Sequence, residues 1–163
     1  MIVFRIITNQ WSNSLTASGY PARWNSRGNM MIYTAESRSL ACLENLVHRS
    51  GEGNNAFYKV MLIDIPSTIE IETLDISSLR ADWYTTENYR YCQDIGNNWL
   101  NDQRFAVLKI PSVIIKKEDN YLLNPHHPDF KMIKLLGNEE FDFDKRFWSM
   151  LFKLTLKNLL KLL

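Results

Sequence analysis

The sequence predicts a single α+β domain. Segments with the composition of short β-strands outnumber helical segments, and the two kinds do not alternate along the chain, which disfavours a doubly wound fold. The chain has 163 residues, of which 45% are hydrophobic and 12% aromatic. Such a chain is long enough to bury a core and too apolar to be disordered.

Composition disfavours several classes of function. The net charge is only +1, so direct binding to nucleic acid is not expected. Cys42 and Cys92 have no metal-type or disulfide-scaffold spacing, and the adjacent His126 and His127 lack a third ligand, so no metal site is expected. Without a secretory signal or a long apolar run, we expect a cytoplasmic protein that does not enter membranes.

Residues 22–44 contain the main candidate site. A turn carrying Arg23 and Asn25 leads into a short β-prone segment, residues 30–34, which includes Tyr33. After Ser37 the apolar pattern changes from a period of 2 to a period of 3.6, which indicates a strand followed by a helix.

Glu44 lies within the apolar stripe of that helix, together with Leu40, Leu43 and Val47. Burial of an unpaired carboxylate is costly, so Glu44 is expected to have a partner or a task. One alternative is a salt bridge with His48, four residues on. An arginine, a tyrosine and a glutamate brought together would suit an anionic, aromatic, sugar-containing ligand.

The segments before this site predict a strand and a loop. Residues 1–8 are apolar and β-branched, with Arg5 in the middle, either facing solvent on an edge or aimed into a polar cleft. Residues 9–21 are rich in Ser, Asn, Gly and Thr, and a loop of this length is typical of a binding loop or lid.

The segments after the site predict further short strands. Residues 57–65 are apolar on both faces, which is typical of a central strand, and residues 69–74 alternate as a half-buried strand does. Pro111 interrupts residues 105–115 and marks an edge or a bulge, and Ser112 follows it, where a hydroxyl could face a cleft. We also expect a short helix at 95–102 and strands at 120–124, 130–136 and 141–147.

Residues 147–163 predict an amphipathic helix with a wide apolar side. Lys153, Lys157 and Lys161 recur every four residues on one face. The apolar side could dock on the domain itself or on a second copy, giving a homo-oligomer. Binding to a partner-protein groove or to a membrane surface are the alternatives.

Several motifs together resemble one family, the RES-domain toxins of bacterial toxin–antitoxin pairs, which are usually paired with an Xre-type antitoxin. The motifs are ARWNSRG, IYTAES, ACLE, IGNNWL, VLKIPSVII, NYLLNPHHPDF and FDFDKRF, in the family's order from about residue 1 to residue 147. The resemblance predicts a RES domain at 1–147 and a separate helical tail at 148–163.

The resemblance implies short twisted β-sheets flanked by a few helices, as in the diphtheria-toxin-like ADP-ribosyltransferases. It also implies NAD as substrate, with cleavage of the nicotinamide–ribose bond by hydrolysis or phosphorolysis and growth arrest through loss of NAD. An ADP-ribosyltransferase that modifies a cellular protein, or a catalytically weak module that binds a partner, are the alternatives. An Xre-type antitoxin over the cleft is the expected partner.

By position, the resemblance assigns the family's arginine, glutamate and serine to Arg23, Glu44 and Ser112. Arg23 would hold the pyrophosphate of NAD, Glu44 would stabilise an oxocarbenium-like ribose, and Ser112 would position the ribose or the amide. Tyr33 would stack on the nicotinamide. Further candidate NAD-binding residues are Asn124, Arg5 and Asn25.

One position departs from the family's pattern. A glycine usually precedes the arginine, whereas this chain has Ala22. If the backbone there needed a positive φ, Ala22 would strain it.

Overall fold

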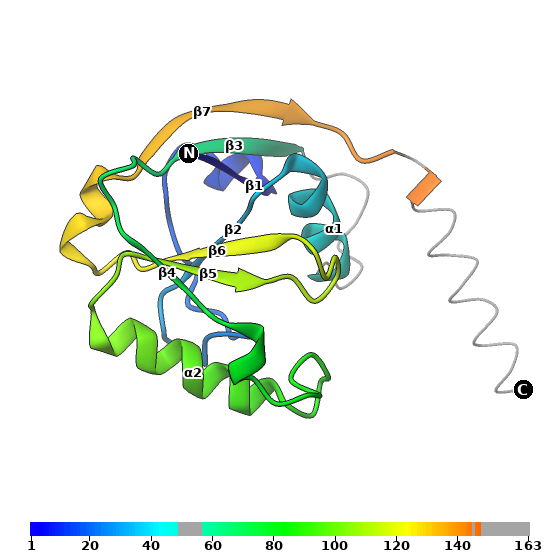
Figure 1. The fold of residues 1–163 in the computed structure, drawn as a ribbon. Helices are drawn as coiled ribbons and strands as arrows, with labels where there is room; N and C mark the ends of the chain where they lie inside the picture. The colour runs from blue at the N-terminus through cyan, green and yellow to red at the C-terminus, as the bar shows by residue number, and fades with distance from the viewer. Residues whose placement is uncertain (49–56, 145, 148–163) are drawn as a thin grey trace, which may run out of the picture.

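A computed structural model describes residues 1–48, 57–144 and 146–147 of the chain. In these residues seven strands form one sheet in the order β4-β5-β6-β2-β1-β3-β7, accompanied by two α-helices (Figure 1). The mixed α+β class predicted from the sequence is confirmed. The elements are β1 Ile2–Thr8, β2 Ile32–Ala35, α1 Arg38–His48, β3 Tyr58–Asp64, β4 Ile71–Thr73, α2 Tyr89–Asp102, β5 Val107–Pro111, β6 Asp119–Leu123 and β7 Lys134–Phe141.

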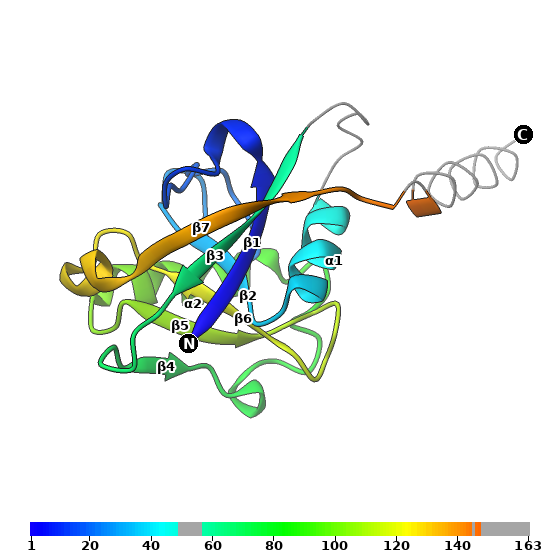
Figure 2. The same cartoon turned by 90° about the horizontal axis from the view of Figure 1, so that it is seen from above.

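The sheet divides between β1 and β2. Strand β1 pairs with β3 over its whole length, and β2 pairs with β6 over all four of its residues. In contrast, the register between β1 and β2 consists of one pair, Phe4 with Ala35. The sheet is therefore two halves that are joined at one point. In Figure 2, β1, β3 and β7 run together at a steep angle to β5 and β6.

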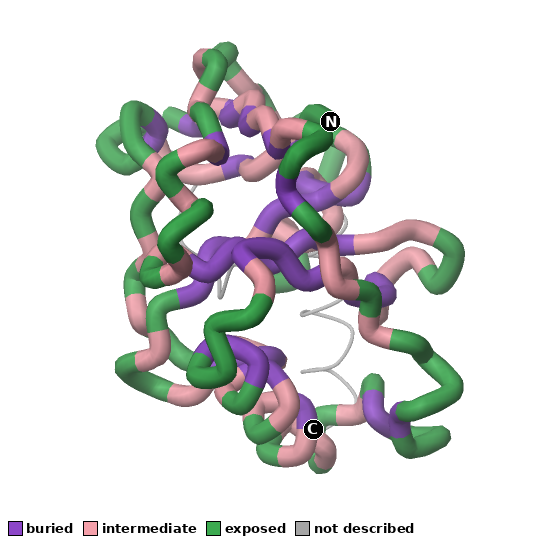
Figure 3. The backbone as a smooth tube through the Cα atoms, turned by 60° about the vertical axis from the view of Figure 1, so that its left-hand side comes forward, coloured by how far each residue is buried: buried purple, intermediate pink, exposed green. Residues whose placement is uncertain are grey.

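Each helix covers a different half of the sheet. Helix α1 buries Leu40 and Ala41 against side chains from β1 and β3, including Ile6 and Val60. Helix α2 lies against β5 and β6 (Figure 1) and buries a second apolar cluster, whose helical members are Cys92, Trp99 and Leu100. A third cluster contains Val3, Ile32, Met61 and Leu123. In Figure 3 the buried stretches lie mainly in the interior of the molecule, and the exposed ones lie mainly in the outer loops.

The structure corrects some predicted element bounds. The second helix begins at Tyr89, six residues before the expected start at residue 95. The strand expected at 130–136 begins only at Lys134, after a 3-10 helix at Pro128–Met132, and continues as β7 to Phe141. The strand expected at 141–147 is wrong, because the described residues after Phe141 form no strand. The expected central strand is confirmed, since β3 lies between β1 and β7. The helical tail expected at 148–163 lies outside the described residues.

Pro111 is the last residue of β5, where it pairs with Asp119. The neighbouring strand β4 has already ended at Thr73, opposite Lys109. At Pro111, β5 therefore has no neighbour on the β4 side, so this end of β5 is locally an edge of the sheet. The missing N–H of proline is tolerated there, which agrees with the predicted edge position.

Leu122 lies fully buried in the middle of the sheet, so the change Leu122→Ala removes core contacts and leaves a cavity. We expect a loss of about 2–5 kcal/mol in the free energy of unfolding, measured by urea denaturation. Leu136→Ala is the matched control, because Leu136 is 59% exposed on β7, and it should change stability by about 0.5 kcal/mol or less. Equal losses would contradict the described core.

Candidate active site

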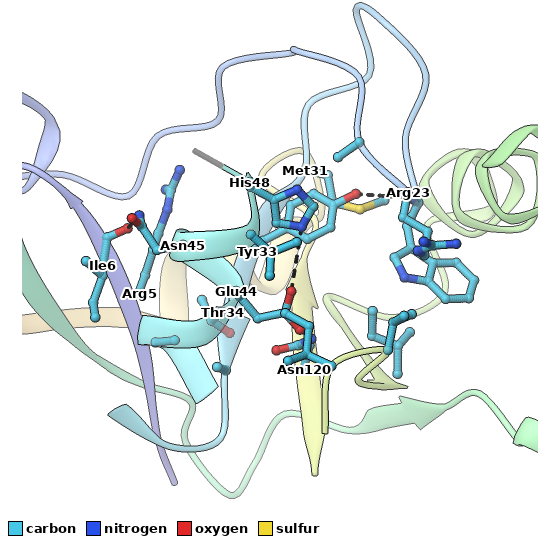
Figure 4. Close-up of a pocket in the computed structure, with 18 of the residues that line it drawn as sticks. Arg5, Ile6, Arg23, Met31, Tyr33, Thr34, Glu44, Asn45, His48 and Asn120 are labelled. Atoms are coloured by element: carbon cyan, nitrogen blue, oxygen red, sulfur yellow. Dashed lines mark hydrogen bonds and ion pairs between the residues drawn. The ribbon is translucent and has the colours of Figure 1, made fainter. Parts of the chain in front are cut away.

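A cavity of about 440 Å³ lies where the two halves of the sheet diverge. Its walls come from β1, β2 and α1, from the loop before β2, and from the ends of β5 and β6. This volume is typical of small-molecule sites. The polar side chains that line it include Arg5, Arg23, Tyr33, Glu44, Asn45, His48 and Asn120 (Figure 4). Arg23, Tyr33 and Glu44, which the sequence analysis grouped, thus line the same cavity.

Glu44 is held by contacts on both carboxylate oxygens. The Oε1 atom accepts hydrogen bonds from Asn120 Nδ2 at 2.6 Å and from Ser112 Oγ at 3.0 Å. The Oε2 atom lies 3.6 Å from His48 Nε2, one helical turn away, so the salt-bridge alternative describes a real contact. These partners come from α1, β6 and the residue after β5, and they fix the carboxylate at the cavity wall.

The environment keeps Glu44 ionised. Burial by itself raises the pKa of the Glu44 carboxyl, but hydrogen bonds from His48, Asn120 and Ser112 stabilise the charged form and together outweigh it. The pKa therefore lies below its ordinary value of 4.5. At neutral pH the cavity presents a fixed negative charge, with a side chain that is only 23% exposed.

Ser112 differs from its predicted placement. From the sequence its hydroxyl is expected to face the cleft, but the residue is 2% exposed and is not among those that line the cavity. Its Oγ donates to Glu44 and accepts from the backbone N–H groups of Ile114 and Ile115. The turn after β5 therefore orients the hydroxyl towards the carboxylate, and Ser112 supports Glu44.

Tyr33 lines the cavity with its ring and anchors the preceding loop with its hydroxyl. The phenol donates to Asn25 Oδ1 at 2.7 Å and accepts from the backbone N–H of Trp24 at 3.1 Å. Burial raises the pKa of the Tyr33 phenol, so this proton is retained throughout the physiological range. The ring remains a flat wall for an aromatic ligand group.

Asn25 serves the loop and does not line the cavity. The side chain is 2% exposed, and its Nδ2 donates to the backbone carbonyls of Tyr20, Ser26 and Asn29. Because Oδ1 accepts from Tyr33, both ends of the side-chain amide are bound within the protein. The predicted ligand-binding role of Asn25 is therefore corrected to a structural one.

Arg23 and Arg5 lie on either side of Tyr33 in Figure 4. Arg23 Nη1 donates to the carbonyls of Trp83 and Thr85, each at 3.1 Å, and its guanidinium carbon lies 4.4 Å from the ring centre of Tyr89. These contacts orient the guanidinium plane at the cavity wall.

Arg5 donates from Nη1 to the carbonyl of Thr16 at 2.7 Å. Burial lowers the pKa of Arg5 to about 10, so the group stays protonated at neutral pH. Of the two placements that the sequence left open, the structure has Arg5 in the cavity wall.

Asn124 lies away from the cavity. It is fully buried at the end of β6, where Nδ2 donates to the carbonyl of Leu100 and Oδ1 accepts from the N–H of His126. The expectation that Asn124 faces the site is corrected, because its side-chain amide instead connects α2 to the turn after β6.

Ala22 is unstrained. Gln103 is the one non-glycine residue with positive φ in the described chain. Ala22 forms an isolated β-bridge with Asn25, and its N–H donates to the Asn25 carbonyl at 2.9 Å. The alanine therefore fits where a glycine was expected.

Asn120 is a site residue that the sequence analysis missed. It is 9% exposed on β6 and donates directly to Glu44. A buried amide at the start of an otherwise apolar strand, NYLL, was the available signal, because buried polar groups require partners.

The described residues hold no group of three or more His, Cys, Asp or Glu that could bind a metal ion. Within the same residues, no helix has the length and apolar character needed to cross a membrane.

The lowered pKa of Glu44 predicts a pH-dependent contribution to stability. A depressed carboxyl pKa stabilises the fold above the unfolded-state value near 4.5, and this stabilisation is lost as the pH falls through the lower folded-state pKa. We therefore expect the unfolding free energy of the wild type to fall more steeply below pH 4.5 than that of Glu44→Gln. Urea denaturation of both proteins between about pH 7 and pH 3 measures this, and parallel curves would contradict it.

The chain is similar to proteins of one family. The RES domain family model matches residues 2–144. The "Prs ADP-ribosylating toxin" of Sphingobium sp. (strain YBL2) is 36% identical over 126 residues, covering 76% of this chain and 78% of the relative. The "Toxin Res" of Photorhabdus laumondii subsp. laumondii is 34% identical, covering 90% of this chain and 96% of the relative.

The fold is also similar to a chain in the crystal structure of the M. tuberculosis MbcT-MbcA toxin-antitoxin complex. The TM-score is 0.68 at 15% sequence identity, and the match covers 86% of this chain and 83% of that one. This similarity concerns the fold alone. The family match over nearly the whole described chain, together with the two relatives above 30% identity, shows that this chain belongs to the RES domain family.

Proposed function

We propose that this chain is the toxin of a bacterial toxin–antitoxin pair and that it breaks the nicotinamide–ribose bond of NAD. The observation that carries the proposal is one cavity lined by an ionised carboxylate, two guanidinium groups and an aromatic ring. Membership of the RES domain family and the relatives named Toxin Res support it.

The wall chemistry suits a dinucleotide. A pyrophosphate carries negative charge and several acceptor oxygens, and the planar fork of Arg23 or Arg5 can donate to it. The ring of Tyr33 offers a stacking surface for the nicotinamide. Glu44 lies between the guanidinium groups in the cavity wall, so that a ligand anchored by its phosphates brings a ribose towards the carboxylate (Figure 4).

Cleavage of the nicotinamide–ribose bond depends on a negative charge near the ribose and needs no general acid for the leaving group. When the C1′–N1 bond breaks, the electron pair goes to the nicotinamide ring, which leaves as a neutral molecule, and positive charge develops on the ribose. A carboxylate fixed beside the ribose stabilises that charge without reorganisation. The lowered pKa of Glu44 makes it a weak base and a persistent anion, which suits this electrostatic role. Ser112 and Asn120 hold the charge in place.

A second candidate differs in the acceptor. The relative from Sphingobium, 36% identical, is named as an ADP-ribosylating toxin. In that case the ADP-ribosyl group passes from NAD to a nucleophilic protein side chain while nicotinamide leaves, and the same three residues, Arg23, Tyr33 and Glu44, keep their roles. A non-catalytic module that binds a partner through the cleft is the third hypothesis.

The proposed partner is an antitoxin, of the Xre type, seated over the cavity in the cytoplasm. Tyr20 and Val47 line the cavity yet are 70% and 66% exposed. These two side chains give an antitoxin apolar contacts beside the cavity. The proposed oligomer through the tail concerns residues outside the described chain.

Incubation of the purified protein with NAD separates the three hypotheses. We expect free nicotinamide and ADP-ribose to appear in water, or nicotinamide and a phosphorylated ADP-ribose when inorganic phosphate is present, measured by chromatography. Release of nicotinamide only after addition of cell extract, with label from NAD on a protein, would favour the transferase. No release under either condition would contradict the enzymatic proposals.

Glu44→Gln should greatly slow nicotinamide release while it leaves NAD binding largely intact, because Gln keeps an acceptor for Asn120 and Ser112 but loses the charge. We expect a loss of about 10²–10³ in kcat, the magnitude seen for preorganised electrostatic groups.

Glu70→Gln provides the control for Glu44→Gln. Glu70 is exposed and does not line the cavity, so kcat should stay unchanged. Retention of wild-type kcat by Glu44→Gln would remove Glu44 from the chemistry.

A further inference from the structure

One face of α2 holds the loop that carries Arg23. Gln93, Gly96 and Asn97 are spaced by three and four residues, so they lie on the same side of the helix. Each of them contacts the segment between Ala22 and Asn29. None of the three is among the residues that line the cavity.

Gly96 permits a close approach of the loop to the helix. A Cβ atom built on Gly96 would lie 1.9 Å from the carbonyl oxygen of Trp24 and 2.8 Å from its carbonyl carbon. Because both atoms belong to the backbone, a side chain at Gly96 would displace the residue that follows Arg23. The glycine is therefore required for the observed position of the loop.

Gln93 and Asn97 hold the two ends of the same loop by hydrogen bonds. Gln93 Nε2 donates to the carbonyl of Ala22 at 2.9 Å. Asn97 Oδ1 accepts from the N–H of Ser26 at 3.2 Å and from Asn29 Nδ2 at 2.7 Å, while Asn97 Nδ2 donates to Ser26 Oγ at 3.0 Å. The backbone on both sides of Arg23 is thus tied to one rigid helix.

The side chain of Arg23 is oriented from the same region. The two carbonyls that accept from its Nη1 belong to Trp83 and Thr85, in the segment leading into α2, and Tyr89 is the first residue of that helix. The backbone around Arg23 and its guanidinium group are therefore held by α2 and the segment that leads into it, whereas Glu44 is on α1 in the other half of the fold.

We propose that Gln93 and Asn97 are positioning residues for NAD, which set its affinity by fixing the loop that presents Arg23. The proposal rests on the proposed function, in which Arg23 binds the pyrophosphate. Neither residue touches the ligand. Both reduce the conformational freedom that Arg23 would otherwise lose on binding.

Asn97→Ala and Gln93→Ala test this role. We expect the KM for NAD to rise roughly five- to twentyfold with kcat changed less than about twofold. The reason is that the loss of these partly buried hydrogen bonds loosens the loop but leaves the Glu44 carboxylate in place. The Kd for NAD, measured by calorimetry in the Glu44→Gln background, should rise by the same factor. Asn98→Ala is the matched control, because the neighbouring Asn98 is exposed, and it should leave KM unchanged.

A conservative change and a double-mutant cycle distinguish positioning from general damage. Asn97→Asp keeps the acceptor for Ser26 and Asn29, so it should restore most of the affinity. Arg23→Ala should weaken NAD binding by itself, and Asn97→Ala or Gln93→Ala should add little further loss in that background, because the role passes through Arg23.

The outcomes separate this proposal from the proposed function. A wild type that neither binds nor cleaves NAD overturns both. A wild type that cleaves NAD while Gln93→Ala and Asn97→Ala keep its KM overturns the positioning role alone, as would fully additive losses with Arg23→Ala. If Asn97→Ala does not fold, as judged by circular dichroism, Gln93→Ala carries the test.

Discussion

The hydrogen-bonded carboxylate of Glu44 is the constraint on which the site depends. A buried negative charge is unfavourable by itself, and the fold compensates for it with three donors, Asn120, Ser112 and His48. These donors come from three elements. The hydrogen-bonded environment of the carboxylate therefore exists only when α1, β6 and the turn after β5 are packed together. The same contacts that permit its burial also keep it charged, which is what stabilisation of a developing cation requires.

The cavity beside this carboxylate follows from the way the sheet divides. A continuously paired sheet would bring β1 and β2 together along their length, and side chains from both would fill the space between them. Here the two strands meet at Phe4 and Ala35 and then diverge, while each stays fully paired with its other neighbour. The opening is therefore stabilised by the outer pairings of β1 with β3 and of β2 with β6.

The two sides of the cavity are supported separately. Glu44 and His48 project from α1, which packs on the half containing β1 and β3. Arg23 belongs to a loop that is fastened to α2, which packs on β5 and β6. The charge that would act on the ribose and the cation that would hold the phosphates thus have independent supports. Because of this separation, substitutions around Arg23 should change the affinity for NAD, and substitutions around Glu44 should change the rate of turnover.

The sequence by itself determined the α+β class, most strands, the helix carrying Glu44, and the grouping of Arg23, Tyr33 and Glu44, because apolar periodicity and a carboxylate within an apolar stripe are local signals. Its motifs also pointed to the RES family. Tertiary structure decided that Ser112 and Asn25 face protein partners, that Asn124 lies elsewhere, and that Asn120 and α2 support the site. These contacts join residues up to 76 positions apart, as between Asn120 and Glu44. No local pattern encodes which of several buried amides or hydroxyls will meet a given partner once the strands are paired.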